Sequence, residues 1–211
     1  MAHTIETALE YNKGALNAVW SQLSGATLPP SPRNDLVWAY LRVSITHHEA
    51  IHMLCSHKMI ASAFALLRSQ IESVFRGLWV NLIATDEQVE AIREHGKDPF
   101  PRLSFRQMAS DIDTAYGATG WFQSFADHWG TLNGYTHTGL EQLGRQFRDD
   151  ATLAPNYPEE FILSLLVTSG TTSIVCIVAV FCHVRLDEKA AALEQWLAEH
   201  PFYRKDDTTS S

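Results

Sequence analysis

The residues that organise this chain run from Ser62 to Trp79 and read SAFALLRSQIESVFRGLW. They contain no proline, and their apolar members recur every three or four positions, as on one face of an α-helix. Those members are Phe64, Leu67, Ile71, Phe75 and Leu78. The pattern predicts a helix whose apolar face lies in the core of the protein.

A second row of side chains, here called the charged row, runs beside that apolar face. It consists of Arg68, Glu72 and Arg76, which are four residues apart and therefore stack into one stripe of a helix. A carboxylate between two guanidinium groups forms ion pairs worth roughly 0.2–0.5 kcal/mol each when exposed, and the partners keep one another ionised when partly buried. The charged row is therefore either a polar seam between packed helices or part of a charged site.

The composition indicates a soluble protein with a sizeable core. Hydrophobic residues make up 45% of the 211 residues and charged residues 19%, which suits one large domain. The formal net charge of −8 argues against a broad nucleic-acid-binding surface, although it leaves a local basic pocket open. The three cysteines lie in apolar segments without metal-ligand spacing, and the N-terminus does not resemble a signal peptide. We therefore expect a cytoplasmic location.

Helical periodicity and capping residues account for the rest of the chain. We expect helices at about 5–23, 35–55, 57–84, 86–95, 105–116, 121–147, 159–184 and 187–199. The expected N-caps are Thr4, Asn34, Ser56, Thr85 (in a capping box with Gln88) and Ser104. No convincing strand pattern is present. The sequence predicts an all-α, single-domain multi-helix bundle over residues 1–204, followed by a disordered tail over 205–211.

Residues 161–184 contain no Asp, Glu, Lys or Arg and are long enough to cross a bilayer. Their middle, however, reads TSGTTS from Thr168 to Ser173, and no strong basic flank adjoins them. Serine and threonine hydroxyls are accommodated in a buried helix, where they bond to the backbone. We therefore expect a long buried C-terminal helix in a soluble bundle and not a membrane span.

His48, Glu49 and His52 match the HExxH pattern. On a helix, the two imidazoles lie one turn apart and can both bind Zn²⁺, while the glutamate can activate a metal-bound water. The chain contains ten histidines, so a chance match is easy to obtain, and no third ligand is placed by its spacing. One alternative is therefore a zinc-dependent hydrolase, and the other is a set of core and surface side chains without metal.

Asn133 and His137 are four residues apart and would share one face of a helix. Histidine titrates near neutral pH, which suits it to general acid–base catalysis. If His137 meets the charged row in space, the cluster combines an acid–base, a cation for a phosphate and a carboxylate that orients the ring. The alternative is a structural hydrogen bond from His137 to Glu72 that locks two core helices together.

Two blocks of the sequence, Ser62 to Trp79 and YTHTG from Tyr135 to Gly139, resemble a group of uncharacterised bacterial helical proteins. Those proteins carry an SAxALxRxxxExxxRGxW helix and a later YTHxG segment, in the same order and at similar spacing. The resemblance implies an all-helical protein with the charged row and His137 as its signature positions.

More loosely, the arrangement is similar to the HEPN-type helical domains, some of which are metal-independent ribonucleases in toxin–antitoxin and phage-defence systems. Those enzymes carry an arginine four to six residues before a histidine, whereas here Asn133 lies four residues before His137. An arginine of the charged row would have to hold the phosphate instead. This resemblance implies action on RNA or a nucleotide without a cofactor. A non-catalytic helical interaction protein, acting as a homodimer, is the remaining alternative.

Overall fold

A computed structural model describes residues 4–95, 104–117, 120–137, 139–148, 152–200 and 202. These residues form ten α-helices, and their one β-type pairing is an isolated antiparallel bridge between Phe147 and Leu153. The predicted all-α multi-helix class is confirmed. The expected tail over 205–211 lies outside the described residues, so its disorder stays a prediction.

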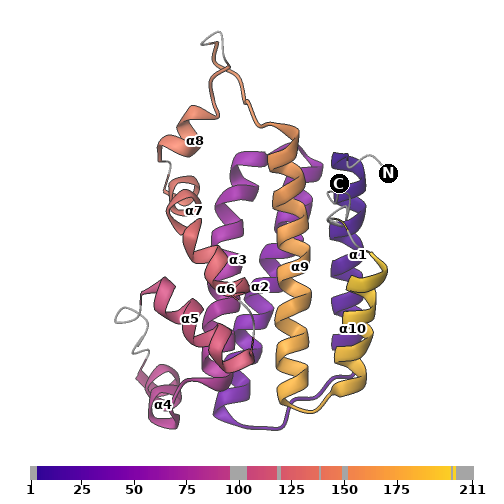
Figure 1. The fold of residues 1–211 in the computed structure, drawn as a ribbon, viewed down its shortest axis with the longest axis vertical. Coiled ribbons are helices and arrows are strands. Elements are labelled where there is room, and N and C mark those ends of the chain that lie inside the picture. The colour runs from indigo at the N-terminus through magenta and orange to yellow at the C-terminus, as the bar shows by residue number, and fades with distance from the viewer. Residues whose placement is uncertain are drawn as a thin grey trace, which may run out of the picture.

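Four long helices form the core of the bundle (Figure 1). They are α1 (Ile5–Leu23), α2 (Pro32–Ser56), α3 (Ile60–Leu82) and α9 (Glu159–His183), and α10 (Asp187–Glu199) packs on α9 and α1. The most extensive helix pair is α2 with α3. Glycine at position 77 permits their close approach, since a Cβ atom there would lie only 3.1 Å from the Cβ of Tyr40.

Among the described elements, five shorter helices lie beside the long ones (Figure 1). They are α4 (Asp86–His95), α5 (Phe105–Tyr116), α6 (Trp121–Asp127), α7 (Trp129–Thr136) and α8 (Leu140–Gly144). Of these, α5 and α7 pack directly on α3, whereas α8 lies towards the end of the bundle, beside the segment that leads into α9. The central helix thus contacts both the long helices and the shorter ones.

The apolar face predicted for α3 forms the centre of the core. All five of its predicted apolar residues are buried. Phe75 is fully buried, and its ring stacks on Phe105 with the centroids 4.5 Å apart. Phe122 and Phe125 of α6 meet the same ring edge-on, at 5.5 and 6.1 Å. One phenylalanine therefore joins α5 and α6 to α3.

Two polar residues in the middle of α9, Ser169 and Ser173, form hydrogen bonds with the neighbouring α3. The Gln70 amide of α3 donates to the carbonyl of Ser169 and the hydroxyl of Ser173, both at 2.9 Å. The Ser169 hydroxyl in turn donates to Gln70 Oε1 at 2.7 Å. Among the described helices, α9 is the one long and apolar enough to cross a membrane, yet 67% of its most apolar segment is buried. This packing is that of a buried core helix, as predicted.

Several helix starts agree with the predicted caps. Thr4 caps α1, Ser104 caps α5, and Thr85 forms the predicted capping box with Gln88 before α4. The second helix starts earlier than predicted. Its cap is Ser31, whose hydroxyl accepts a hydrogen bond from the backbone N–H of Asn34 at 3.1 Å. Pro32 follows at the first helical position, where its fixed φ suits the helix and its missing N–H leaves nothing unpaired.

Ser56 does not cap the third helix, because it is the last residue of α2. The chain turns at Lys58, whose φ is 60°, and α3 starts at Ile60 after Met59.

The segment expected as one helix over 121–147, unless its four glycines mark breaks, is divided into α6, α7 and α8. The first break is at His128 and the second is at His137 to Gly139. At the second break, the Gly139 N–H donates to the Gly134 carbonyl at 2.6 Å. A Cβ atom on Gly139 would lie 2.9 Å from the Gly134 Cα, so this close turn requires glycine.

Candidate functional site

The charged row forms on α3 as predicted. Glu72 lies between the two arginines and accepts from Arg76 Nη2 at 2.7 Å and Arg76 Nε at 3.1 Å. Its second oxygen lies 3.3 Å from Arg68 Nη2. The three side chains are 20–27% exposed, so they are half-buried and still reach solvent. Two guanidinium groups share one carboxylate, which leaves one net positive charge on this stripe.

The helix α7 covers one end of the charged row. The Arg68 guanidinium lies over the Trp129 ring at 4.8 Å from its centroid, a distance typical of a cation–π contact. The Trp129 ring also stacks on Phe105, with the ring centroids 3.5 Å apart. Further along α7, the Thr136 hydroxyl lies 3.4 Å from the Ala65 carbonyl. Arg68 therefore helps to hold α7 against α3.

Asn133 lies on the face of α7 that meets α3, because Trp129, Asn133 and Thr136 recur at helical spacing. Its Oδ1 atom is buried and has no hydrogen-bond partner among the described residues. The Nε atom of Arg68 is also buried and has no hydrogen-bond partner among the described residues. An unpaired donor and an unpaired acceptor are therefore both buried on the helices that form this seam, and each costs stability while it stays unpaired.

His137 lies beside this cluster and not within it. It is the C-cap residue of α7, its backbone N–H donates to the Asn133 carbonyl at 3.0 Å, and its side chain is exposed. Within the described part of the chain, its ring makes no hydrogen bond or ion pair with the charged row. The structure thus brings together Arg68, Glu72 and Arg76, with Asn133 on the facing helix, while the His137 ring stays in solvent.

The HExxH histidines are joined to α1 through Asn12. His48 is completely buried, and its Nε2 atom donates to the backbone carbonyl of Asn12 at 3.1 Å. His52 Nδ1 lies 3.2 Å from Asn12 Oδ1, and Asn12 Nδ2 donates to the Leu166 carbonyl of α9 at 2.7 Å. Burial lowers the pKa of His48 to about 4, because the charged ring would lose its hydration. This network ties α1, α2 and α9 together.

Glu49 is also engaged in a structural contact, because it accepts a hydrogen bond from the indole of Trp20 at 2.9 Å. Because Nε2 of His48 donates a hydrogen bond, the nitrogen of His48 that carries no proton is Nδ1. This atom is buried and has no hydrogen-bond partner among the described residues. In the described parts of the chain, no group of three His, Cys, Asp or Glu side chains is arranged to hold a metal ion. The arrangement of the His48, Glu49 and His52 side chains therefore does not support the alternative of a zinc-dependent hydrolase.

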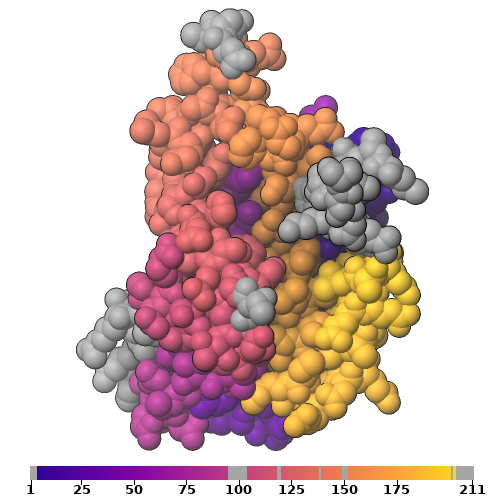
Figure 2. All heavy atoms as spheres, viewed as in Figure 1, coloured from indigo at the N-terminus to yellow at the C-terminus, as the bar shows by residue number. Residues whose placement is uncertain are grey.

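A pocket that the sequence did not indicate opens between α3, α7 and α9. Its volume is about 350 Å³. Phe64, Leu67 and Ile71 of α3 line it, and Ser124 and Phe125 of α6 do so as well. Figure 2 shows the hollow between α7 and α9, with α3 visible at its bottom. Three separate segments of the chain make this pocket, so no local motif could have revealed it.

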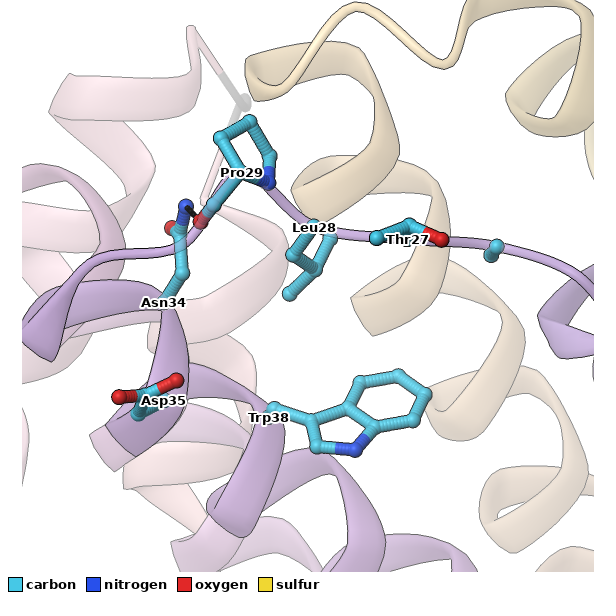
Figure 3. Close-up of a pocket in the computed structure, with 7 residues that line it drawn as sticks. Thr27, Leu28, Pro29, Asn34, Asp35 and Trp38 are labelled. Atoms are coloured by element: carbon cyan, nitrogen blue, oxygen red, sulfur yellow. Dashed lines mark hydrogen bonds between the residues drawn. The ribbon is translucent and has the colours of Figure 1, made fainter.

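A smaller pocket, of about 230 Å³, lies beside the turn between α1 and α2 (Figure 3). It is lined by residues of the turn and of the start of α2, among them Thr27, Leu28, Pro29, Asn34, Asp35 and Trp38. The Asn34 amide donates to the Pro29 carbonyl at 2.6 Å, so this polar group stabilises the turn itself. We assign the pocket to the packing of the turn.

The fold and the charged row define an all-α bundle with a half-buried Arg–Glu–Arg seam on its central helix. The model of a family described as "Family of unknown function (DUF6988)" matches residues 41–204, and the chain belongs to this family. The match includes the HExxH residues, the charged row and His137, whereas α1 lies outside it. No curated protein and no solved structure matches the chain.

Proposed function

We propose that this is a non-catalytic helical interaction protein whose working form is a homodimer. The observation that carries the proposal is an exposed apolar surface on the segment between α7 and α9, here called the arm (residues 139–148 and 152–158). Its large apolar residues are Leu140, Leu143, Phe147 and Leu153, which are 83%, 49%, 44% and 78% exposed. Clustered exposed apolar side chains are typical of interaction sites in soluble proteins.

The arm keeps a defined shape through its own backbone hydrogen bonds. The Arg148 N–H donates to the Thr152 carbonyl at 3.0 Å, and the Ala154 N–H donates to the Gln146 carbonyl at 2.9 Å. These bonds flank the bridge between Phe147 and Leu153. Residues directly opposite in an antiparallel pair project to the same side, so these two side chains form one surface.

A second copy of the chain is the partner that this surface fits best. An apolar patch is complementary to itself, so two arms can meet around a two-fold axis, as in most homodimers. The chain as a whole carries a formal charge of −8, which makes most contacts between copies repulsive. Between positions 139 and 158 the sequence carries three acidic side chains (Glu141, Asp149 and Asp150) and two basic ones (Arg145 and Arg148), a net charge of −1, so like-charge repulsion is small there.

We expect the double substitution Leu140→Glu and Leu153→Glu to convert the dimer to a monomer, because each dimer would bury four unpaired carboxylates. Sedimentation equilibrium measures the dimer dissociation constant, which should rise by at least about 100-fold if roughly 3 kcal/mol of apolar burial is lost.

The matched control is Val43→Glu with Met53→Glu, which adds the same charge at two exposed apolar positions of α2. This variant should keep the dissociation constant of the wild type. An equal rise in both variants would place the contact elsewhere.

The HExxH residues and the charged row are both engaged in structural contacts, and this supports a non-catalytic role. The HExxH side chains bond to α1, and Arg68 is stacked on Trp129. These contacts engage His48, His52, Glu49 and Arg68. The prediction of a cytoplasmic location is compatible with this role and stays a prediction.

Action on RNA or a nucleotide is the second candidate, in keeping with the resemblance to HEPN-type domains. It is favoured by the net positive charge of the half-buried charged row and by the exposed ring of His137 one turn beyond Asn133. In this candidate Arg68 or Arg76 holds a phosphate and His137 moves the proton.

If this candidate is correct, single-stranded RNA is cleaved in the presence of EDTA, and His137→Ala slows cleavage by about 100-fold or more. His183→Ala, at another exposed histidine, is the control and should have no effect. Cleavage that persists unchanged in His137→Ala would eliminate the candidate.

A further inference from the structure

We propose that the pocket between α3, α7 and α9 binds an uncharged ring compound that carries a hydroxyl group. The pocket volume of about 350 Å³ lies within the range of roughly 300–1,000 Å³ that small-molecule sites occupy. None of the described residues that line it is Asp, Glu, Lys or Arg. A charged ligand would lose its hydration there without gaining an ionic partner, so the lining favours a neutral one.

The inner surface of the pocket is suited to a flat ring. Phe64 and Tyr135 stack with their centroids 4.6 Å apart and their planes 18° from parallel. Both line the pocket together with Leu67 and Leu132. Burying an apolar ring against such side chains is favourable, because apolar surface is removed from water. An apolar ring is the body that this lining favours, since aromatic side chains also pair edge-on with rings.

Hydrogen-bonding groups lie on both sides of this apolar surface. On α9, Ser164 and Thr168 are four residues apart and share one side of the helix, and neither hydroxyl is bonded to another described residue. On the opposite side, His128 Nδ1 donates to the Ser124 carbonyl at 2.9 Å. The Nε2 atom of the neutral ring is therefore an acceptor, which a ligand hydroxyl can satisfy.

The test uses three probes of one ring size, namely 1-naphthol, naphthalene and 1-naphthalenesulfonate, titrated into the full chain with fluorescence detection. We expect 1-naphthol to bind about tenfold more tightly than naphthalene, the difference that one well-formed hydrogen bond makes. The sulfonate should bind more weakly than either. The Arg145 guanidinium lies 4.5 Å from the centroid of the Phe161 ring, which lines the pocket, so tight binding of the sulfonate would show that this cation selects an anion and would overturn the proposal.

Two variants locate the binding. Ser164→Trp places a large ring in the pocket from an exposed position and should abolish naphthol binding, whereas Ser62→Trp, on an exposed part of α3 outside the pocket, should leave it unchanged. Thr168→Val keeps the shape of the side chain and removes its hydroxyl, which should reduce the preference for naphthol over naphthalene. No naphthol binding by the wild type, or equal loss in both tryptophan variants, would refute the assignment.

Discussion

Phe75→Ala should lower the free energy of unfolding by about 3–5 kcal/mol, because this ring is fully buried and its truncation leaves a cavity. Phe105 would lose its stacked partner, and Phe122 and Phe125 would lose their edge contacts. For a chain of this length, the melting temperature should fall by roughly 10 °C or more. Thermal unfolding followed by circular dichroism measures the change.

The matched control is Phe161→Ala, which removes the same ring from a partly exposed position. Its cost should stay below about 1.5 kcal/mol, since little apolar surface returns to water and no closed cavity forms. An equal loss of unfolding free energy in Phe75→Ala and Phe161→Ala would contradict our conclusion that the apolar face of α3 forms the centre of the core.

Acidification from pH 7 to pH 4 should remove about 3 kcal/mol of stability through His48 alone. Burial lowers the pKa of this ring from 6.5 to about 4 in the folded chain, whereas the unfolded chain keeps the ordinary value. As the pH falls below 6.5, the unfolded chain takes up the proton first, so stability decreases progressively until the folded pKa is passed. The difference between the two pKa values corresponds to about 3 kcal/mol.

The comparison that isolates this effect is His48→Gln, whose amide can still donate to the Asn12 carbonyl but does not titrate. Urea unfolding measured across this pH range should show the wild type losing about 3 kcal/mol more than the variant. Parallel stability curves for the two proteins would contradict the burial of a neutral His48.

The sequence predicts much of the fold because several helices are specified locally. The capping residues Thr4, Thr85 and Ser104 and the apolar spacing of 62–79 need no knowledge of the rest of the chain. The errors arise where tertiary contacts decide the outcome. The break at Gly139 depends on the approach of its own backbone to Gly134, and the glycines in the sequence cannot show which of them makes that contact.

The candidate site could be predicted only in part, for the same reason. The ion pairs of the charged row follow from four-residue spacing on one helix, and they form. The partner of His48, by contrast, is Asn12, on another helix and 36 residues earlier, so the HExxH pattern alone cannot distinguish a metal site from a structural network. The pocket between α3, α7 and α9 likewise exists only once three segments have packed.

The measurement that tests the proposed homodimer most directly is the molar mass of the full chain in solution, obtained by light scattering over a concentration series. The exposed apolar arm predicts twice the mass of one chain at high concentration, with a decrease towards the mass of one chain on dilution. The mass of a single chain at every concentration would contradict the proposal.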